Sequence, residues 1–456
     1  MGNERTPLMT SAGESNLKRI QEHEAAPRWN VRIGDRLEKE DLASYDRFRK
    51  KVLSNTTFSK KIPLHLIEWI ETQREKVVLF REAIPQGFDV QKDWAHIPTM
   101  SREDIACRPE DIVPRGESLD RLIVYDTSGT TGHALVVPHH PQAVALNHAL
   151  AEYVLKRHGV EAEFSANSVA CLNICAQRKT HVFCNVFSVW NEAGFAKINL
   201  NPKDWAGGRQ GARKFILDLA PIFITADPVS LAELMKWQIP VKPSLIISTA
   251  LTLSKELQKS FENYFGCPVV NWYSTTETGP IAASIAGKDG LFFLAPDLFV
   301  EVVDEDGIPL PFGKTGEITV TGGRNPYLPL LRYRTGDFGK MADSPLRLTE
   351  LVGRKLVFFR ATDGSMVNPV DISREMRIVS PFVQHEFIQK KDGSCIVKIR
   401  PAINANISVK AMANAIKGLF GQEQKLEVII DEHLGKENPS GKVISWQSEL
   451  ELETKQ

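Results

Sequence analysis

The most informative stretch of this 456-residue sequence is Asp126-Thr127-Ser128-Gly129-Thr130-Thr131-Gly132. It follows an apolar run of strand length, Leu122–Tyr125, and precedes a stretch of helical character, Val137–Val160. The two glycines let the backbone approach an anion closely, and hydroxyl groups and turn N–H groups donate to phosphate oxygens. The stretch is not a Walker A loop, because no Gly-Lys-Ser/Thr follows it. By itself it predicts either a phosphate-binding loop or a surface turn.

Apolar runs of strand length alternate with helical stretches after this loop. Residues 222–225, 245–248 and 268–273 have the length and apolar character of buried strands. Residues 254–265 form an amphipathic pattern that ends at Gly266. This alternation predicts an α/β fold, with helices packed outside a sheet.

The rest of the sequence indicates how the chain is divided into domains. Residues 1–60 have mixed charges and little Pro or Gly, which indicates a helical leader. Residues 298–340 contain short strands separated by Gly/Pro turns, which predicts a small antiparallel or barrel-like subdomain. We therefore expect a large N-terminal α/β domain over 1–353 and a separate small α+β domain over 354–456.

Composition excludes several classes of protein. Basic and acidic residues number 56 each, and no dense basic stripe is present. A dedicated nucleic-acid partner is therefore not expected. Apolar residues make up 42% of the chain, but none of the apolar runs reaches the ~18 residues of a membrane span. The polar residues 1–17 do not resemble a secretory signal.

Six cysteines are too few for a disulfide scaffold in a chain of this length, so a reducing, cytoplasmic compartment is expected. Cys171, Cys175, His181 and Cys184 are zinc ligands by type. Their spacing matches no standard zinc knuckle and their surroundings are apolar, which favours buried free thiols.

Four further segments carry chemistry, and each is weak in isolation. Trp272–Gly279 offers an aromatic ring that can stack on a purine, followed by hydroxyls and the Glu277 carboxylate for phosphate or Mg²⁺. In Arg332–Asp337 a Gly turn presents a carboxylate that can accept two ribose hydroxyls. Gly353-Arg354 precedes a strand, and Asn438–Lys442 places a lysine after a flexible turn. A solvated lysine, a surface glutamate and a turn-capping aspartate are the structural alternatives for Lys442, Glu277 and Asp337.

Together, and in this order, the five segments resemble the adenylate-forming superfamily of acyl-CoA synthetases, adenylation domains and luciferases. Within it, the chain is most similar to the phenylacetate–CoA ligase family. The resemblance covers roughly residue 60 to the end. It implies that a carboxylate attacks the α-phosphate of ATP to give an acyl-adenylate and pyrophosphate. The thiol of coenzyme A then takes the acyl group, after the small, mobile C-terminal domain has rotated.

The resemblance also implies a role for each matching residue. Thr276 contacts the α-phosphate, Glu277 holds Mg²⁺, and Lys442 bridges the substrate carboxylate and the α-phosphate. Tyr273 flanks the adenine opposite Ser248, Thr249 and Ala250. Asp337 holds the ribose hydroxyls, with Arg354 near the ribose or phosphate. The β- and γ-phosphates are held by Thr127, Ser128, Gly129, Thr130, Thr131 and Gly132.

The chain departs from the superfamily pattern at three places. The residues after the glycine loop are His133-Ala134-Leu135, without the lysine common in the superfamily. The adenine segment ends in Ala250 rather than in an acidic residue. The hinge has Lys355-Leu356-Val357 where acidic residues are usual, which puts the hinge motion and the second half-reaction in question.

The substrate pocket is the part that the sequence defines least. The resemblance implies a carboxylic acid, in the first instance an aromatic one, and the candidate lining residues are His181, Phe183, Asn185, Trp190 and Trp272. Two alternatives to a CoA ligase remain open. The chain could load its acyl group onto a carrier protein, an amine or a protein cysteine, or it could bind a nucleotide without turnover. Homodimerisation is expected only by analogy with relatives.

Overall fold

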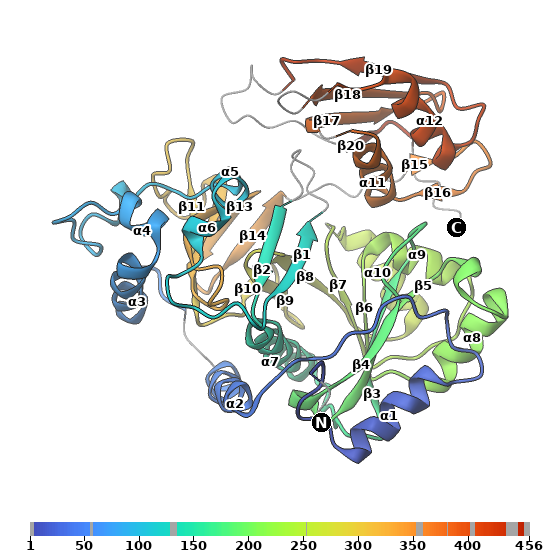
Figure 1. Cartoon of the computed structure of the whole chain (residues 1–456), viewed down its shortest axis with the longest axis horizontal. Helices are drawn as coiled ribbons and strands as arrows, with labels where there is room; N and C mark the ends of the chain where they lie inside the picture. Colours follow the sequence, from blue (N-terminus) through green and yellow to red (C-terminus); the bar gives the residue numbers. More distant parts are fainter. Residues whose placement is uncertain are drawn as a thin grey trace. The chain divides into compact units, whose positions relative to one another are not determined.

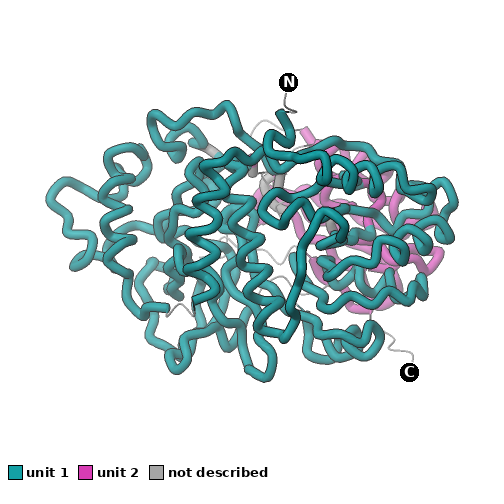
Figure 2. The backbone as a smooth tube through the Cα atoms, turned by 90° about the horizontal axis from the view of Figure 1, so that it is seen from below, with its two compact units in different colours: residues 1–125, 137–176, 180–354 teal, residues 126–136, 177–179, 355–456 magenta. Residues whose placement is uncertain are grey.

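The computed structural model describes residues 4–54, 58–127, 135–251, 253–352, 359–380, 382–401, 406–434 and 446–450. The chain forms two compact units (Figure 2). Unit 1 comprises residues 1–125, 137–176 and 180–354, and unit 2 comprises residues 126–136, 177–179 and 355–456. Each unit has a hydrophobic core of its own.

Unit 1 is built on one twelve-stranded sheet (Figure 1). In spatial order its strands are β11 (Leu298–Val303), β12 (Thr315–Gly322), β13 (Leu330–Asp343), β14 (Leu346–Val352), β10 (Leu291–Phe293), β9 (Gly279–Ser284), β8 (Val269–Thr275), β7 (Leu245–Ser248), β6 (Phe223–Ala226), β3 (Val169–Cys175), β5 (Ala193–Asn199) and β4 (Phe183–Phe187). The strands β8, β7, β6, β3 and β5 are parallel to one another, as expected for the predicted α/β fold.

The helices of unit 1 precede and alternate with these strands. They are α1 (Ser11–Gln21), α2 (Lys39–Leu53), α3 (Leu64–Lys76), α4 (Val78–Ala83), α5 (Arg102–Cys107), α6 (Pro109–Ile112), α7 (Pro141–Arg157), α8 (Gly208–Leu219), α9 (Pro228–Lys236) and α10 (Lys255–Phe265). Three short 3-10 turns are η1 (Trp94–His96), η2 (Ser188–Trp190) and η3 (Pro202–Asp204). A separate two-stranded sheet pairs β1 (Ile123–Thr127) with β2 (Leu135–His139).

Apolar side chains cover both faces of the parallel strands, because successive residues of a strand point to opposite faces. On one face Leu150 of α7 joins a core cluster with Phe223 and Leu245. On the other face Phe215 of α8 joins a second cluster with Ile224, and α9 and α10 contribute to the same cluster. The two-sided burial explains why these strands read as continuous apolar runs.

The strands of residues 298–340 are antiparallel, but they do not form a separate barrel. The pairing of β8 with β9 continues the parallel sheet into them, and β11 is an edge of the described sheet. The sequence pattern predicts the parallel strands and the antiparallel strands as separate units. Hydrogen bonding across the β8–β9 hairpin joins them into one open sheet.

Two helix boundaries differ from the sequence prediction. The helix predicted from Val137 begins at Pro141, and residues 137–139 belong to strand β2. The residue before a proline disfavours helical geometry, and His140 caps the helix by accepting from the Gln142 N–H at 3.1 Å. The helix predicted over 254–265 begins at Lys255, because Ser254 caps it by accepting from the Leu257 N–H at 3.2 Å.

The described residues of unit 2 form a four-stranded sheet and two helices. The sheet order is β19 (Leu426–Ile430), β18 (Cys395–Pro401), β17 (Phe382–Gln389) and β20 (Trp446–Ser448). The short strands β15 (Phe359–Arg360) and β16 (Met366–Val367) pair with each other. Helices α11 (Pro369–Val379) and α12 (Val409–Phe420) pack on the sheet, and their core includes Phe359, Phe387 and Phe420. Within the described part of the chain, no helix has the length and apolar character that a bilayer crossing requires.

Candidate active site

The turn between β8 and β9 carries the predicted Thr276 and Glu277. Thr275 pairs with Gly279, so residues 276–278 form a three-residue hairpin loop. The Thr275 hydroxyl accepts from the Thr278 N–H at 3.1 Å and lies 3.0 Å from the Thr278 hydroxyl. These bonds fix the loop. Thr276 is exposed at its tip, whereas Glu277 is buried.

Gly279 ends this loop with a φ of +67°. Three-residue hairpin loops commonly place a left-handed residue at this point, and glycine adopts that conformation without strain. A Cβ atom at Gly279 would lie 2.9 Å from the Arg324 Nη1 and 3.0 Å from the Asn147 Oδ1. The glycine is therefore required both by the backbone and by the space around it.

Glu277 is held by two donors from distant elements. Its Oε1 accepts from the Arg102 guanidinium at 2.9 Å and from the Tyr333 hydroxyl at 2.9 Å. Arg102 starts α5, and Ser101 caps that helix with Asp104 in a capping box. Burial, and next the Glu277 charge, raises the pKa of Tyr333, so its hydroxyl stays protonated as a donor. No hydrogen bond of the described residues is found at Oε2 of Glu277.

A bulge in β13 brings Tyr273 and Asp337 to the same place. Residues 335–337 interrupt the pairing of β12 with β13, between Glu317 and Thr319. The Thr335 hydroxyl accepts from the Tyr273 hydroxyl at 3.2 Å and from the Asp337 N–H at 3.2 Å. Burial and the adjacent Asp337 charge raise the pKa of Tyr273 well above its usual value. Bulges next to functional sites commonly serve to re-aim a side chain in this way.

The segment Ser248–Ala250 begins at the last residue of β7, next to β8. Ser248 is buried, and its hydroxyl has no partner in the described structure. Ala250 is exposed and has a φ of +68°, a left-handed conformation that is unusual for a residue with a Cβ atom. Such strain is commonly found near functional sites.

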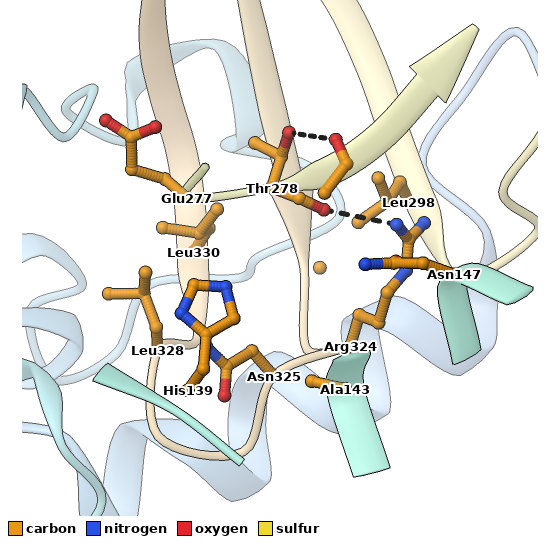
Figure 3. Close-up of a pocket in the computed structure, with 12 residues that line it drawn as sticks. His139, Ala143, Asn147, Glu277, Thr278, Leu298, Arg324, Asn325, Leu328 and Leu330 are labelled. Carbon is orange, nitrogen blue, oxygen red and sulfur yellow. Dashed lines mark hydrogen bonds between the residues drawn. The ribbon is translucent and has the colours of Figure 1, made fainter. Parts of the chain in front are cut away.

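A small pocket lies beside Glu277 (Figure 3). Its cavity volume is about 20 Å³, which is little more than one water molecule needs. His139 and Glu277 line one side of it, and Asn147 and Arg324 line another. The Arg324 guanidinium donates to the Thr278 carbonyl at 3.2 Å and pairs with Asp297. The pocket is thus the supporting layer behind the hairpin loop, and it is too small for an aryl group.

The structure brings some of the predicted site residues together and leaves others undescribed. Glu277, Thr276, Tyr273 and Asp337 lie around β8 and the β13 bulge. Thr127 ends β1, and only its backbone is described. Ser128, Gly129, Thr130, Thr131, Gly132, Arg354 and Lys442 lie outside the described residues, as do the hinge residues Lys355, Leu356 and Val357.

The candidate pocket residues fall into different environments. Trp190 is 3% exposed, donates to Glu152 at 3.0 Å and stacks on Phe164, so it is part of the core. Trp272 also belongs to the core cluster on the α7 face. His181 is exposed. Phe183 and Asn185 lie on β4.

Sequence reasoning missed the residues that hold this site in place. They come from four separate parts of the chain, namely Arg102 from α5, His139 from β2, Arg324 from the β12–β13 connection and Tyr333 from β13. No local pattern therefore connects them with Glu277. One local signal was available, since Tyr333 lies four residues before Asp337 in a segment already singled out. The thiols of Cys171, Cys175 and Cys184 are all free and buried.

Comparisons with known proteins give matches over most of this chain. The model of the AMP-binding enzyme family matches residues 67–325. The phenylacetate-coenzyme A ligase of Pseudomonas putida is 25% identical over 356 residues, covering 73% of this chain and 75% of its own. Protein CapK of Staphylococcus aureus is 22% identical over 339 residues, covering 71% and 74%.

A solved structure shows the same fold over most of the chain. A 2-hydroxyisobutyryl-CoA ligase, in complex with its acyl-adenylate and CoA, superimposes with a TM-score of 0.55 and 15% identity. The match covers 88% of this chain and 93% of that one.

Proposed function

Since the chain belongs to the AMP-binding enzyme family, we propose that it activates a carboxylic acid, in the first instance an aromatic one, with ATP. The product is an acyl-adenylate, and the acyl group then passes to the thiol of coenzyme A, with release of AMP and pyrophosphate. The observation that carries this proposal is the Glu277 carboxylate, which two distant donors hold beside an exposed Thr276. The CoA ligases among the relatives support the acceptor.

Glu277 suits a magnesium ion shared with phosphates. Mg²⁺ usually takes one or two carboxylates and completes its shell with substrate phosphates and water. Arg102 and Tyr333 both bind Oε1, and no donor of the described residues binds Oε2, so Oε2 can face the ion. Among the described residues, none of the His, Cys, Asp and Glu side chains form a group of three that could hold a metal alone. The ion would neutralise charge between ATP and the attacking carboxylate.

The family resemblance supplies the remaining roles in unit 1. The Tyr273 ring lines the place for the adenine, and the Asp337 carboxylate accepts the ribose hydroxyls. Thr276, exposed at the tip of its loop, donates to the α-phosphate. The proposal also assigns the phosphate loop 127–132, Arg354 and Lys442 the roles that the family resemblance gives them. The free cysteines support the proposed cytoplasmic compartment.

The test is acid-dependent exchange of pyrophosphate into ATP, measured without CoA across a panel of aryl, amino-aryl and short alkyl acids. We expect exchange with one class of acid, and a loss of at least a hundredfold in Glu277→Gln and Lys442→Ala. Addition of CoA should then release AMP and form a thioester. Exchange without CoA transfer would favour a carrier protein or an amine as the acceptor, and ATP binding without any exchange would contradict the proposal.

A further inference from the structure

A lysine lies on an inner face of the parallel sheet. Lys197 is in β5 between Ala196 and Ile198, which are completely buried on the α8 face. Because side chains alternate along a strand, Lys197 points to the α7 face, as does Phe195 two residues before it. Lys197 is half-buried there.

The pairing register places other polar groups next to this lysine. Lys197 is opposite Asn173 of β3 on one side and opposite Phe183 of β4 on the other. Asn173 is in turn opposite Thr225 of β6, and its amide donates to the Thr225 hydroxyl at 2.9 Å. Lys197, Asn173 and Thr225 therefore form a row across the adjacent parallel strands β5, β3 and β6.

This row lies toward the carboxyl ends of its strands, where open α/β sheets bind their ligands. The thiol of Cys175, the last residue of β3, donates to the side-chain Oδ1 of Asn173 at 3.5 Å. Burial raises the pKa of the Cys175 thiol to about 11, and the Lys197 charge opposes that effect. Cys175 shares the face of the row, because it follows Asn173 by two residues along β3.

Lys197 has no ion pair or hydrogen bond with any residue that the structure describes. Asp227 follows the end of β6, two residues after Thr225. Its oxygens are taken by Ser230, which donates its N–H at 2.9 Å and its hydroxyl at 2.7 Å. A partly desolvated cation without a counter-ion is unfavourable unless an anion or water molecules accept its hydrogen bonds.

A second unpartnered polar group lies on the same face. Asn185 is opposite Phe195 in the register, two residues from Phe183 along β4. It is fully buried, and neither its amide nitrogen nor its carbonyl oxygen has a partner in the described structure. Buried amides are nearly always hydrogen-bonded, so this one indicates a missing ligand or water.

We propose that this face, defined by Lys197, Asn173, Thr225 and Asn185, receives the remote end of the acid, and that the acid carries a second anionic group there, such as a carboxylate. The proposal rests on the proposed function and names its substrate class. The ammonium pairs with the remote anion, and the amides and the hydroxyl complete its hydrogen bonds. The half-buried Phe183 and Phe195 contact the apolar middle of the substrate.

The position of the row also sets the length of the acid. The reacting carboxylate lies beyond the end of β8, and β5 is four strand spacings away, or about 19 Å. The flexible four-carbon stem of Lys197 spans part of this distance. The remote anion is therefore on the order of 10 Å from the reacting carboxylate, which excludes diacids as short as malonate.

The test compares matched acids in pyrophosphate exchange. One is a rigid aryl diacid with carboxylates about 10 Å apart, the second is its mono-amide, and the third is malonate. In the wild type we expect kcat/KM to favour the diacid over the mono-amide by ten- to a hundredfold, with no exchange for malonate. Lys197→Met, which removes the charge and nearly keeps the length of the side chain, should abolish this preference by lowering kcat/KM for the diacid far more than kcat/KM for the mono-amide. Lys203→Met, at an exposed lysine of η3, should keep the preference.

Equal use of the diacid and the mono-amide by the wild type would overturn the inference. So would an equal loss for both acids in Lys197→Met, because that result indicates a structural role. Calorimetric binding of the diacid separates the inference from the proposed function. If no acid supports exchange but Lys197→Met abolishes diacid binding, the proposed function fails and the binding face stands. If the diacid neither exchanges nor binds, both fail.

Discussion

At the scale of single residues, the site depends on one carboxylate with two donors. Glu277 is 5% exposed, and its Oε1 is shared by Arg102 and Tyr333. A buried carboxylate is stable only when its hydrogen bonds are made. The two donors therefore fix which oxygen of Glu277 remains available to a ligand.

Removal of one donor should weaken the proposed metal site without unfolding the protein. In Tyr333→Phe we expect the Mg²⁺ concentration for half-maximal pyrophosphate exchange to rise about tenfold, because a hydrogen bond to a charged group contributes roughly 1.5–3 kcal/mol. Tyr327→Phe is the matched control, since Tyr327 is equally buried but donates to the Ser118 carbonyl. Equal magnesium dependence in both variants would contradict the role of Tyr333.

Asp337 allows a second test at this scale. In Asp337→Asn we expect the KM for ATP to rise roughly ten- to a hundredfold, since the neutral amide accepts the ribose hydroxyls less well than the carboxylate. The value of kcat should change much less. Asp343→Asn, in the same strand and paired with the exposed Lys60, is the control. A loss in kcat alone would place Asp337 at the reacting atoms instead of the ribose.

At the scale of elements, the β8–β9 hairpin positions the site through its turn geometry. Gly279→Ala meets both a left-handed backbone and two close atoms. Gly266→Ala is a control for the backbone alone, because Gly266 has a φ of +70° and open space around it. Left-handed geometry costs a non-glycine residue about 1–2 kcal/mol, so we expect that loss in Gly266→Ala and a larger one in Gly279→Ala. Denaturant unfolding measures both, and only Gly279→Ala should also lose exchange activity.

At the scale of the whole molecule, the two units have separate cores, and each contains a buried histidine. Burial lowers the pKa of His148 in unit 1 to about 4 and that of His385 in unit 2 to about 3. His385 packs against Phe382 and Trp446 without a hydrogen bond to a described residue. Both side chains are therefore neutral in the folded protein at pH 7.

His385 makes unit 2 sensitive to acid. Its pKa is lower in the folded chain than the usual 6.5, so the unfolded chain binds more protons below that pH, and stability falls as pH falls from about 6.5 toward 3. We expect a loss of about 2 kcal/mol between pH 7 and pH 5. His385→Phe should remove that part of the pH dependence, and His433→Gln, at an exposed histidine of unit 2, should not. Denaturant unfolding curves at pH 7 and pH 5 test this prediction. If His385→Phe loses as much free energy of unfolding between the two pH values as the wild type does, the prediction is wrong.

The sequence by itself determined the α/β class and the order of the segments that carry chemistry. Strand and helix periodicities and turn residues are local properties, so 245–248, 254–265 and 268–273 could be assigned directly. The boundary at His140 was missed because Pro141 acts on the residues before it. Tyr273, Glu277 and Asp337 could be named from their motifs, and their roles remain predictions.

Only the tertiary structure decided which distant groups meet. Arg102 and Tyr333 are 175 and 56 residues from Glu277, and no local pattern links them. The single open sheet, in place of a separate barrel, results from the β8–β9 pairing. Strand order likewise places Lys197 beside Asn173 and Thr225. The physical reason is that chain periodicity fixes which face a side chain takes, whereas its neighbours on that face depend on how strands from the whole chain pair.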